Sequence, residues 1–387
     1  MIRRFCTRLC GLLILLTSCC AFGGIRPSFM LDYSSWHATD IVVVTPLADD
    51  GSFQVLESWK GDLRPGAIIA IPDLAPKPDS VPINWYPHDS FSPFKRWTEV
   101  PVVPPGSRIV LYLKDGSQAA ESTGERSRWV AANLFSDMKA SAAWIYDGRA
   151  YGFVQMINPG PSVFVRLWYS TERNAGEVRR EELSESSLKE RTFDVLRLQQ
   201  QIEAAVAIED RKARAEALRS YADSKIYPAK NFALEELGKS GEAALPTIRS
   251  MLDDPKFSKD DGTLVEQYAK AGGAAAGPEL TSRLEADVKY WQAIGPTLPV
   301  GWWNLIDQNG IWAETHGYRD RYSQTIFLIR SLDEIRYQPA VFAAEQLRDF
   351  WKSLPQLNDP SGLNQTANEA DKLVKHLQPG NSEGDER

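Results

Sequence analysis

The sequence predicts an α+β protein in two parts: an N-terminal antiparallel β-barrel or sandwich, followed by an all-α region. Three observations lead to this prediction. Between about 32 and 169, short runs of β-branched and aromatic residues alternate with turn-forming residues. From about 186 onwards, apolar residues instead recur at spacings of three and four, as in amphipathic helices. The chain has 387 residues, which is enough for two domains.

The first residues are typical of an export signal. The chain opens MIRRFCTRLCGLLILLTSCC, with Arg3, Arg4 and Arg8 ahead of a short apolar run at 9–16. A membrane-spanning helix needs about 20 apolar residues. The run is too short for that, so we expect a secretory signal peptide at 1–18.

All four cysteines lie within this opening segment, at positions 6, 10, 19 and 20. The run LTSC at 16–19 resembles the lipobox of bacterial lipoproteins, an apolar residue and two small residues before a cysteine. The resemblance implies that Cys19 carries a diacylglycerol thioether, becomes the mature N-terminus and anchors the chain to a membrane. The alternative is ordinary signal-peptidase cleavage after Gly23. Either way we expect an exported protein of the cell envelope or periplasm.

The composition narrows the class of partner. Lysine and arginine number 44 against 51 aspartate and glutamate, which gives a formal net charge of −7. A nucleic-acid-binding protein normally carries a basic patch, so we expect no nucleic-acid partner. The mature chain has at most two adjacent cysteines, so its stability must come from hydrophobic cores and not from disulfides.

The β-rich part is assigned to 26–170. Asp147-Gly148 predicts a hairpin turn, and Gly, Pro and Asp separate the other runs. The expected strands lie within 40–46, 51–59, 67–72, 108–116, 142–156 and 162–169.

A long insertion at 74–106 interrupts these strands. Its eight prolines exclude a central strand or helix. It also carries five aromatic residues: Trp85, Tyr86, Phe91, Phe94 and Trp97. Loops of this length tend to be functional or disordered. We consider two roles, a cover folded over the barrel and a loop that binds a ligand or protein.

The segment FQVLESWKGDLRPGAIIAIP at 53–72 has the form strand, Trp-Lys-Gly-Asp, Pro-Gly, strand. It resembles the OB-like barrel of netrin and metalloproteinase-inhibitor modules. Those families are usually rich in disulfides and this chain is not, so the resemblance implies a barrel fold and not an inhibitor. Lys60-Gly61-Asp62 and Pro65-Gly66 are expected to form the turn between the two strands.

The all-α region is assigned to 186–378, after a linker at 171–185 and before a disordered tail at 379–387. Within it, 232–254 aligns with 264–286 at an offset of 32. The aligned identities are Gly241, Ala243, Ala244, Pro246 and Leu252 on Gly273, Ala275, Ala276, Pro278 and Leu284.

This pattern resembles HEAT-type helical repeats, in which a helix, a small-residue turn and a second helix with an early proline form one unit. A third unit is expected at 325–351. The resemblance implies stacked helix pairs that bury a continuous core. The alternative is an irregular helical bundle. The HEAT-like interpretation predicts four buried residues, Leu237, Leu252, Ala269 and Leu284. It predicts that Glu235 and Arg249 are exposed.

The search for catalytic chemistry yields no catalytic residue, cofactor-binding residue or metal ligand. The four histidines, His37, His88, His316 and His376, are not at metal-ligand spacing, and no nucleophile elbow or phosphate loop is present. We therefore expect no cofactor. The best candidate for a polar pocket lined by aromatic residues comprises Trp302, Trp303, Trp312, Glu314 and His316.

Two hypotheses follow for function. The first is an exported, membrane-anchored binding or scaffold protein of the cell envelope, with a protein partner and no catalysis. The second is an envelope-associated hydrolase with its site between the aromatic loops 83–97 and 302–318. The second requires these loops to converge on a cleft that contains a histidine and a carboxylate.

Overall fold

The computed structural model of the chain divides into two compact units, 1–199 and 200–387. The signal peptide, Cys19, most of the insertion and the C-terminal tail lie outside the described residues. The described ranges are 29–75, 106–116, 128–133, 137–155, 162–174, 177–298, 316–354 and 365–378.

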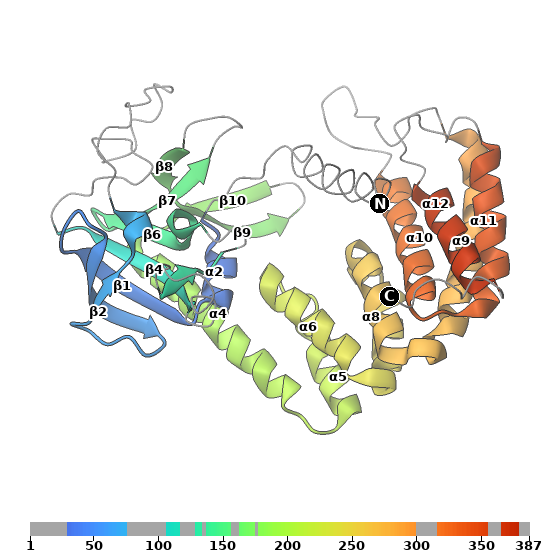
Figure 1. Ribbon diagram of the computed structural model, residues 1–387, viewed down its shortest axis with the longest axis horizontal. Coiled ribbons are helices and arrows are strands. Elements are labelled where there is room, and N and C mark those ends of the chain that lie inside the picture. The colour runs from blue at the N-terminus through green and yellow to red at the C-terminus, as the bar shows by residue number, and fades with distance from the viewer. Residues whose placement is uncertain are drawn as a thin grey trace, which may run out of the picture. The chain divides into compact units, whose positions relative to one another are not determined.

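The first unit contains an antiparallel sheet whose strand order is β3-β2-β1-β4-β6-β7-β8, with β5 paired to β4 (Figure 1). No pairing among the described strands joins β3 to β8, so the sheet is open and not a closed barrel. The strands are β1 (Asp40–Pro46), β2 (Ser52–Lys60), β3 (Ile68–Ala70), β4 (Arg108–Asp115), β5 (Trp129–Ala131), β6 (Ala142–Tyr146), β7 (Arg149–Gln155) and β8 (Ser162–Arg166).

The segment expected as a linker, 171–185, is not an irregular connection. It contains the end of β9 (Trp168–Asn174), all of β10 (Glu177–Glu182) and the first residue of α4 (Glu185–Val206). Among the described strands, β9 and β10 pair only with each other, as a second antiparallel sheet. β10 reads EVRREE, and such a charged run carries little of the apolar alternation that predicts a strand.

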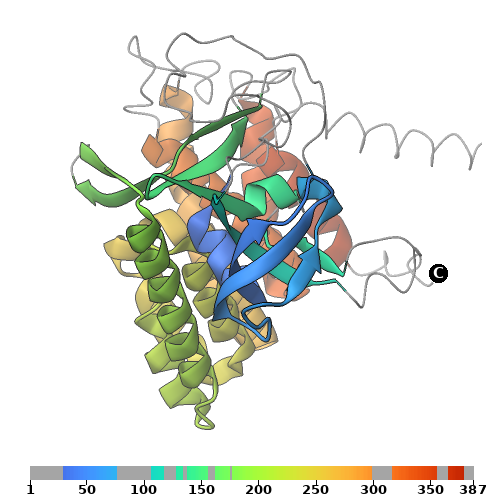
Figure 2. The same cartoon turned by 90° about the vertical axis from the view of Figure 1, so that its left-hand side faces the viewer.

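Both faces of the central strands are buried. Val42 and Val44 belong to one hydrophobic cluster, whereas Ile41 and Val43 belong to the other. Successive side chains of a strand point to opposite faces, so the continuous apolar run IVVV at 41–44 supplies both clusters. The second cluster is completed by helix α2 (Leu31–His37), which packs against β4 (Figure 2), and by the first turns of α4.

The Trp-Lys-Gly-Asp segment owes its composition to a tight turn after β2. Gly61 has a φ of +88°, and a Cβ there would lie 2.2 Å from Asp40 Oδ1. The backbone N–H of Asp62 donates a hydrogen bond of 3.0 Å to the same oxygen. Asp40 is buried at the start of β1, so this carboxylate fixes where the turn joins the sheet. The segment is therefore explained by structure alone.

The second unit is helical, which together with the sheet confirms the predicted α+β layout. Helices α6, α8 and α10 lie in succession, since α8 packs against both of the others (Figure 1). No helix within the described ranges combines the length and apolar character that crossing a membrane requires. The helices after α4 are α5 (Arg211–Arg219), α6 (Tyr227–Lys239), α7 (Leu245–Leu252), α8 (Asp261–Gly272), α9 (Gly277–Ile294), α10 (His316–Glu334), α11 (Val341–Ser353) and α12 (Gln365–Leu377).

The residues aligned at an offset of 32 occupy matching places in two successive helix pairs, α6–α7 and α8–α9. Gly241 and Gly273 both have positive φ, +74° and +50°, and each begins a short 3-10 turn. A proline then lies in the first turn of each second helix. The predicted core is confirmed, because Leu237, Leu252, Ala269 and Leu284 are all less than 9% exposed. Glu235 and Arg249 are exposed, as predicted.

Candidate functional site

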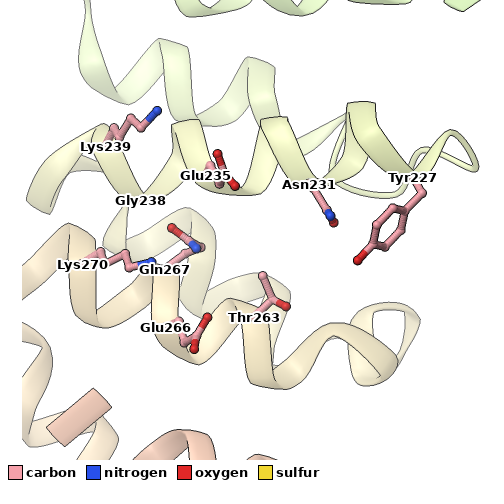
Figure 3. A pocket seen from close by; sticks show the side chains of 9 residues that line it. All are labelled: Tyr227, Asn231, Glu235, Gly238, Lys239, Thr263, Glu266, Gln267 and Lys270. Carbon is pink, nitrogen blue, oxygen red and sulfur yellow. The ribbon is translucent and has the colours of Figure 1, made fainter. Parts of the chain in front are cut away.

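A polar groove of about 510 Å³ lies between α6 and α8 (Figure 3). Its volume is in the range of pockets that bind ligands. α6 and α8 are the first helices of the two successive pairs, and they pack directly against each other. The lining residues are Tyr227, Asn231, Glu235, Gly238, Lys239, Thr263, Glu266, Gln267 and Lys270.

The groove is built from the same helix positions in both pairs. At the offset of 32, Asn231 corresponds to Thr263, Glu235 to Gln267 and Gly238 to Lys270. Within each helix the spacings are four and three residues, so these side chains share one face. The groove therefore lies where corresponding faces of neighbouring helices meet.

Gln267 lies on the floor of this groove. It is only 4% exposed, yet no described residue hydrogen-bonds its carboxamide. Figure 3 shows the carboxamide between the two helices, directed from α8 toward α6. A carboxamide has two N–H donors and one carbonyl acceptor, so Gln267 presents both kinds of group to whatever enters the groove.

Gly238 gives the Gln267 side chain its place. A Cβ at position 238 would lie 2.2 Å from Gln267 Oε1. Gly238 is the penultimate residue of α6, where glycine is tolerated better than in the middle of a helix. The absence of a side chain there leaves the space between the helices that the Gln267 side chain occupies.

The charged groups around Gln267 are only partly paired. Lys239 forms an ion pair of 2.7 Å with Glu236, and this neighbour raises the pKa of the Lys239 ammonium. Glu235 on α6 and Glu266 on α8 form no ion pair with any described residue, and neither does Lys270. The groove thus has one unpaired carboxylate on each wall and one unpaired ammonium.

At the other end of the groove, Tyr227 and Asn231 extend from α6 toward α8 (Figure 3). Tyr227 is 66% exposed although its ring is large and apolar. Tyrosine is enriched among the residues that dominate binding energy at interfaces. This end therefore offers an aromatic surface next to the polar floor.

The pocket predicted from the sequence cannot be located among the described residues. Trp302, Trp303, Trp312 and Glu314 lie outside them, as does the loop 83–97. His316 begins α10, but its side chain is not described. This pocket stays a prediction.

Of the other histidines, His88 also lies outside the described residues. His37 in the first unit has a pKa lowered by burial and, to a lesser extent, by Lys114 and Lys60. His376 in the second unit approaches Asp333, with 3.0 Å between Nδ1 and Oδ1. Within the described ranges, no three His, Cys, Asp or Glu side chains are placed to hold a metal ion.

A second polar cluster joins α9 to α10. Asp287 is 1% exposed and pairs with Arg321. Thr325 donates to Asp287 Oδ2 at 2.6 Å, and Trp291 Nε1 donates to Thr325 at 3.0 Å. Burial raises the pKa of Asp287, and Arg321 opposes this effect. Because the Asp287 carboxylate is buried and already bound by Arg321 and Thr325, we interpret this cluster as a contact that stabilises the packing of α9 on α10 and not as a binding site.

No protein-family model, curated protein or solved structure matches this chain. The sequence analysis missed the groove, although one signal was present. Gly238 follows a run of helix-forming residues, and a glycine at such a place marks either the end of a helix or a close packing contact.

Proposed function

We propose that this chain is an exported binding or scaffold protein of the cell envelope, whose helical region holds a protein partner in the groove between α6 and α8. The observation that carries the proposal is this groove, with its unpaired charges and an exposed tyrosine. Binding surfaces combine a few well-placed polar groups with aromatic side chains.

The proposal includes a HEAT-like stacking of helix pairs. It is supported by the matching turns, prolines and buried positions of α6–α7 and α8–α9. The pair α10–α11 has a related join, with Arg336 at a φ of +50° and Pro339 in the short 3-10 turn before α11. Stacked pairs create extended surfaces on which corresponding positions lie side by side, and such surfaces bind proteins.

Export and lipid anchoring belong to the same proposal. Their support is the leader and the LTSC run at 16–19 in the sequence. Acyl chains at Cys19 would hold the protein at a membrane, since each buried methylene contributes about 0.8 kcal/mol. The proteins available to bind in the groove would then be those of the cell envelope.

A site-specific crosslinking experiment tests the binding role. A photoreactive benzoylphenylalanine replaces Thr263 in the groove, and a matched control replaces Glu285, which is exposed on α9 outside the groove. Both full-length proteins are illuminated in cell-envelope extract. We expect a discrete protein adduct from position 263 that position 285 does not form. The same adducts from both positions, or none from 263, would contradict the proposal.

A further inference from the structure

We infer that the occupant of the groove is an extended peptide segment of the partner that carries a lysine or arginine side chain, with its backbone bound by Gln267. This inference rests on the proposed function and specifies what the groove recognises. The carboxamide of Gln267 indicates that the ligand presents a peptide backbone. The glutamates and the tyrosine of the groove indicate that it carries a cationic side chain.

The Gln267 carboxamide matches the peptide group, because each presents an N–H donor and a carbonyl acceptor. Its side chain is 96% buried, so little conformational freedom is left to lose when a ligand binds. No described residue competes for its hydrogen bonds. An extended backbone in the groove would give the carboxamide hydrogen bonds that no described residue supplies.

The charge balance of the groove favours a cation. Glu235 and Glu266 contribute one carboxylate from each wall, while Lys239 is already paired with Glu236. The remaining ammonium, Lys270, is on the side of Gln267 in Figure 3, where it can meet a backbone carbonyl or an acidic group of the ligand. A lysine or arginine of the ligand would therefore meet two carboxylates that form no ion pair with any described residue.

Tyr227 adds a second reason for a cationic side chain. Its ring is exposed at the end of the groove opposite the lysines. Ammonium and guanidinium groups are attracted to the face of a tyrosine ring, and their aliphatic stems pack on it. The ring thus offers an extended basic ligand a further contact, about 12 Å along α6 from Glu235.

The test uses the full-length protein and an array of end-capped peptides of the form Gly-Xaa-Lys-Xaa-Gly, with Glu and Gln in place of Lys as matched sets. Each lysine peptide is also made with N-methylated backbone amides, which removes the N–H donors. We expect the lysine set to bind about tenfold more tightly than the glutamine set. N-methylation should weaken binding by a similar factor, about tenfold.

Variants assign these effects to the groove. Gln267→Leu should abolish the effect of N-methylation, because the variant lacks the carbonyl oxygen that would accept a hydrogen bond from the peptide N–H. Gly238→Ala should weaken binding by displacing the same carboxamide, while the helix is retained. Glu266→Gln should reduce the preference for lysine, whereas Glu285→Gln, on an exposed surface away from the groove, should leave it unchanged.

Each outcome decides a different point. If Gln267→Leu and Gly238→Ala, checked as folded by circular dichroism, bind the lysine set like the wild type, the inference is overturned. A preference for the glutamate set overturns it as well. If no peptide binds but the adduct at position 263 persists, the peptide inference fails and the proposed function stands. If both are absent, both fail.

Discussion

Asp32 provides a test of how the burial of a carboxyl group affects the stability of the first unit. It lies in the first turn of α2, and its Oδ1 atom is buried without a hydrogen-bond partner among the described residues. Burial raises the pKa of this carboxyl from 3.8 to about 6, and the charge of Arg191 opposes the rise only in part. The proposed perturbation is Asp32→Asn, which removes the titration and keeps the shape.

The direction in which the free energy of unfolding changes with pH follows from proton linkage. The folded state holds the Asp32 proton more tightly than the unfolded state, so the carboxyl costs no stability below the unfolded pKa of about 4. Above the folded pKa of about 6, the side chain is ionised in both states and its burial is penalised. A shift of about two pKa units corresponds to about 3 kcal/mol. Because the side chain is partly exposed, solvent screening reduces the expected penalty to about 1–2 kcal/mol.

The assay is hydrogen–deuterium exchange of the β1 and β4 amides in urea, which follows unfolding of the first unit. Near pH 7.5 the Asn variant should be more stable than the wild type by about 1–2 kcal/mol, and the gap should close by about pH 4. Asp50→Asn is a control of opposite sign, because hydrogen bonds from Ser52 lower the pKa of Asp50. If the difference in the free energy of unfolding between Asp32→Asn and the wild type were constant across this pH range, the reasoning would be refuted.

Three further predictions concern the core, the turn after β2 and the leader. Leu237→Ala should lower the free energy of unfolding by about 2–5 kcal/mol, since Leu237 is 0% exposed, while exposed Glu235→Ala should change it by less than about 0.5 kcal/mol; equal urea midpoints for the two variants would argue against the shared core. Gly61→Ala should cost about 1–3 kcal/mol, because the new Cβ meets Asp40 at a positive φ. An unchanged melting temperature would exclude the strained turn. Cys19→Ala should move the protein from the membrane fraction to the soluble fraction on centrifugation, and retention in the membrane fraction would count against the lipobox.

Where local chemistry decides the structure, the sequence was sufficient. The run 40–46 forms β1 with the same bounds. The hairpin within 142–156 turns at Asp147-Gly148, and both residues have positive φ, +49° and +67°. Such a turn needs residues that tolerate the left-handed region, and the Asp-Gly pair announces it in the sequence.

Where distant pairing decides the structure, the sequence left alternatives open. Whether a sheet closes depends on its edge strands, and period-two alternation only assigns residues to faces. Helix α2 was also missed, because its seven residues, LDYSSWH, include Tyr, Trp and Ser and are too few to show a helical period. Its apolar contacts with β4 hold it in place.

The groove was missed for a different reason. The alignment at an offset of 32 rests on positions that agree between the two helix pairs, and these positions include buried residues such as Leu252 and Leu284 as well as turn residues. The groove is lined by corresponding positions that disagree: Glu235 against Gln267, and Gly238 against Lys270. An alignment by similarity discounts such pairs, although two identical units would place two glycines or two lysines here. Gly238 on one helix and the Gln267 carboxamide on the next meet only because corresponding positions differ between the two helix pairs. The chemistry of the groove therefore depends on positions where the two helix pairs carry different residues, and a similarity alignment gives these positions the least weight.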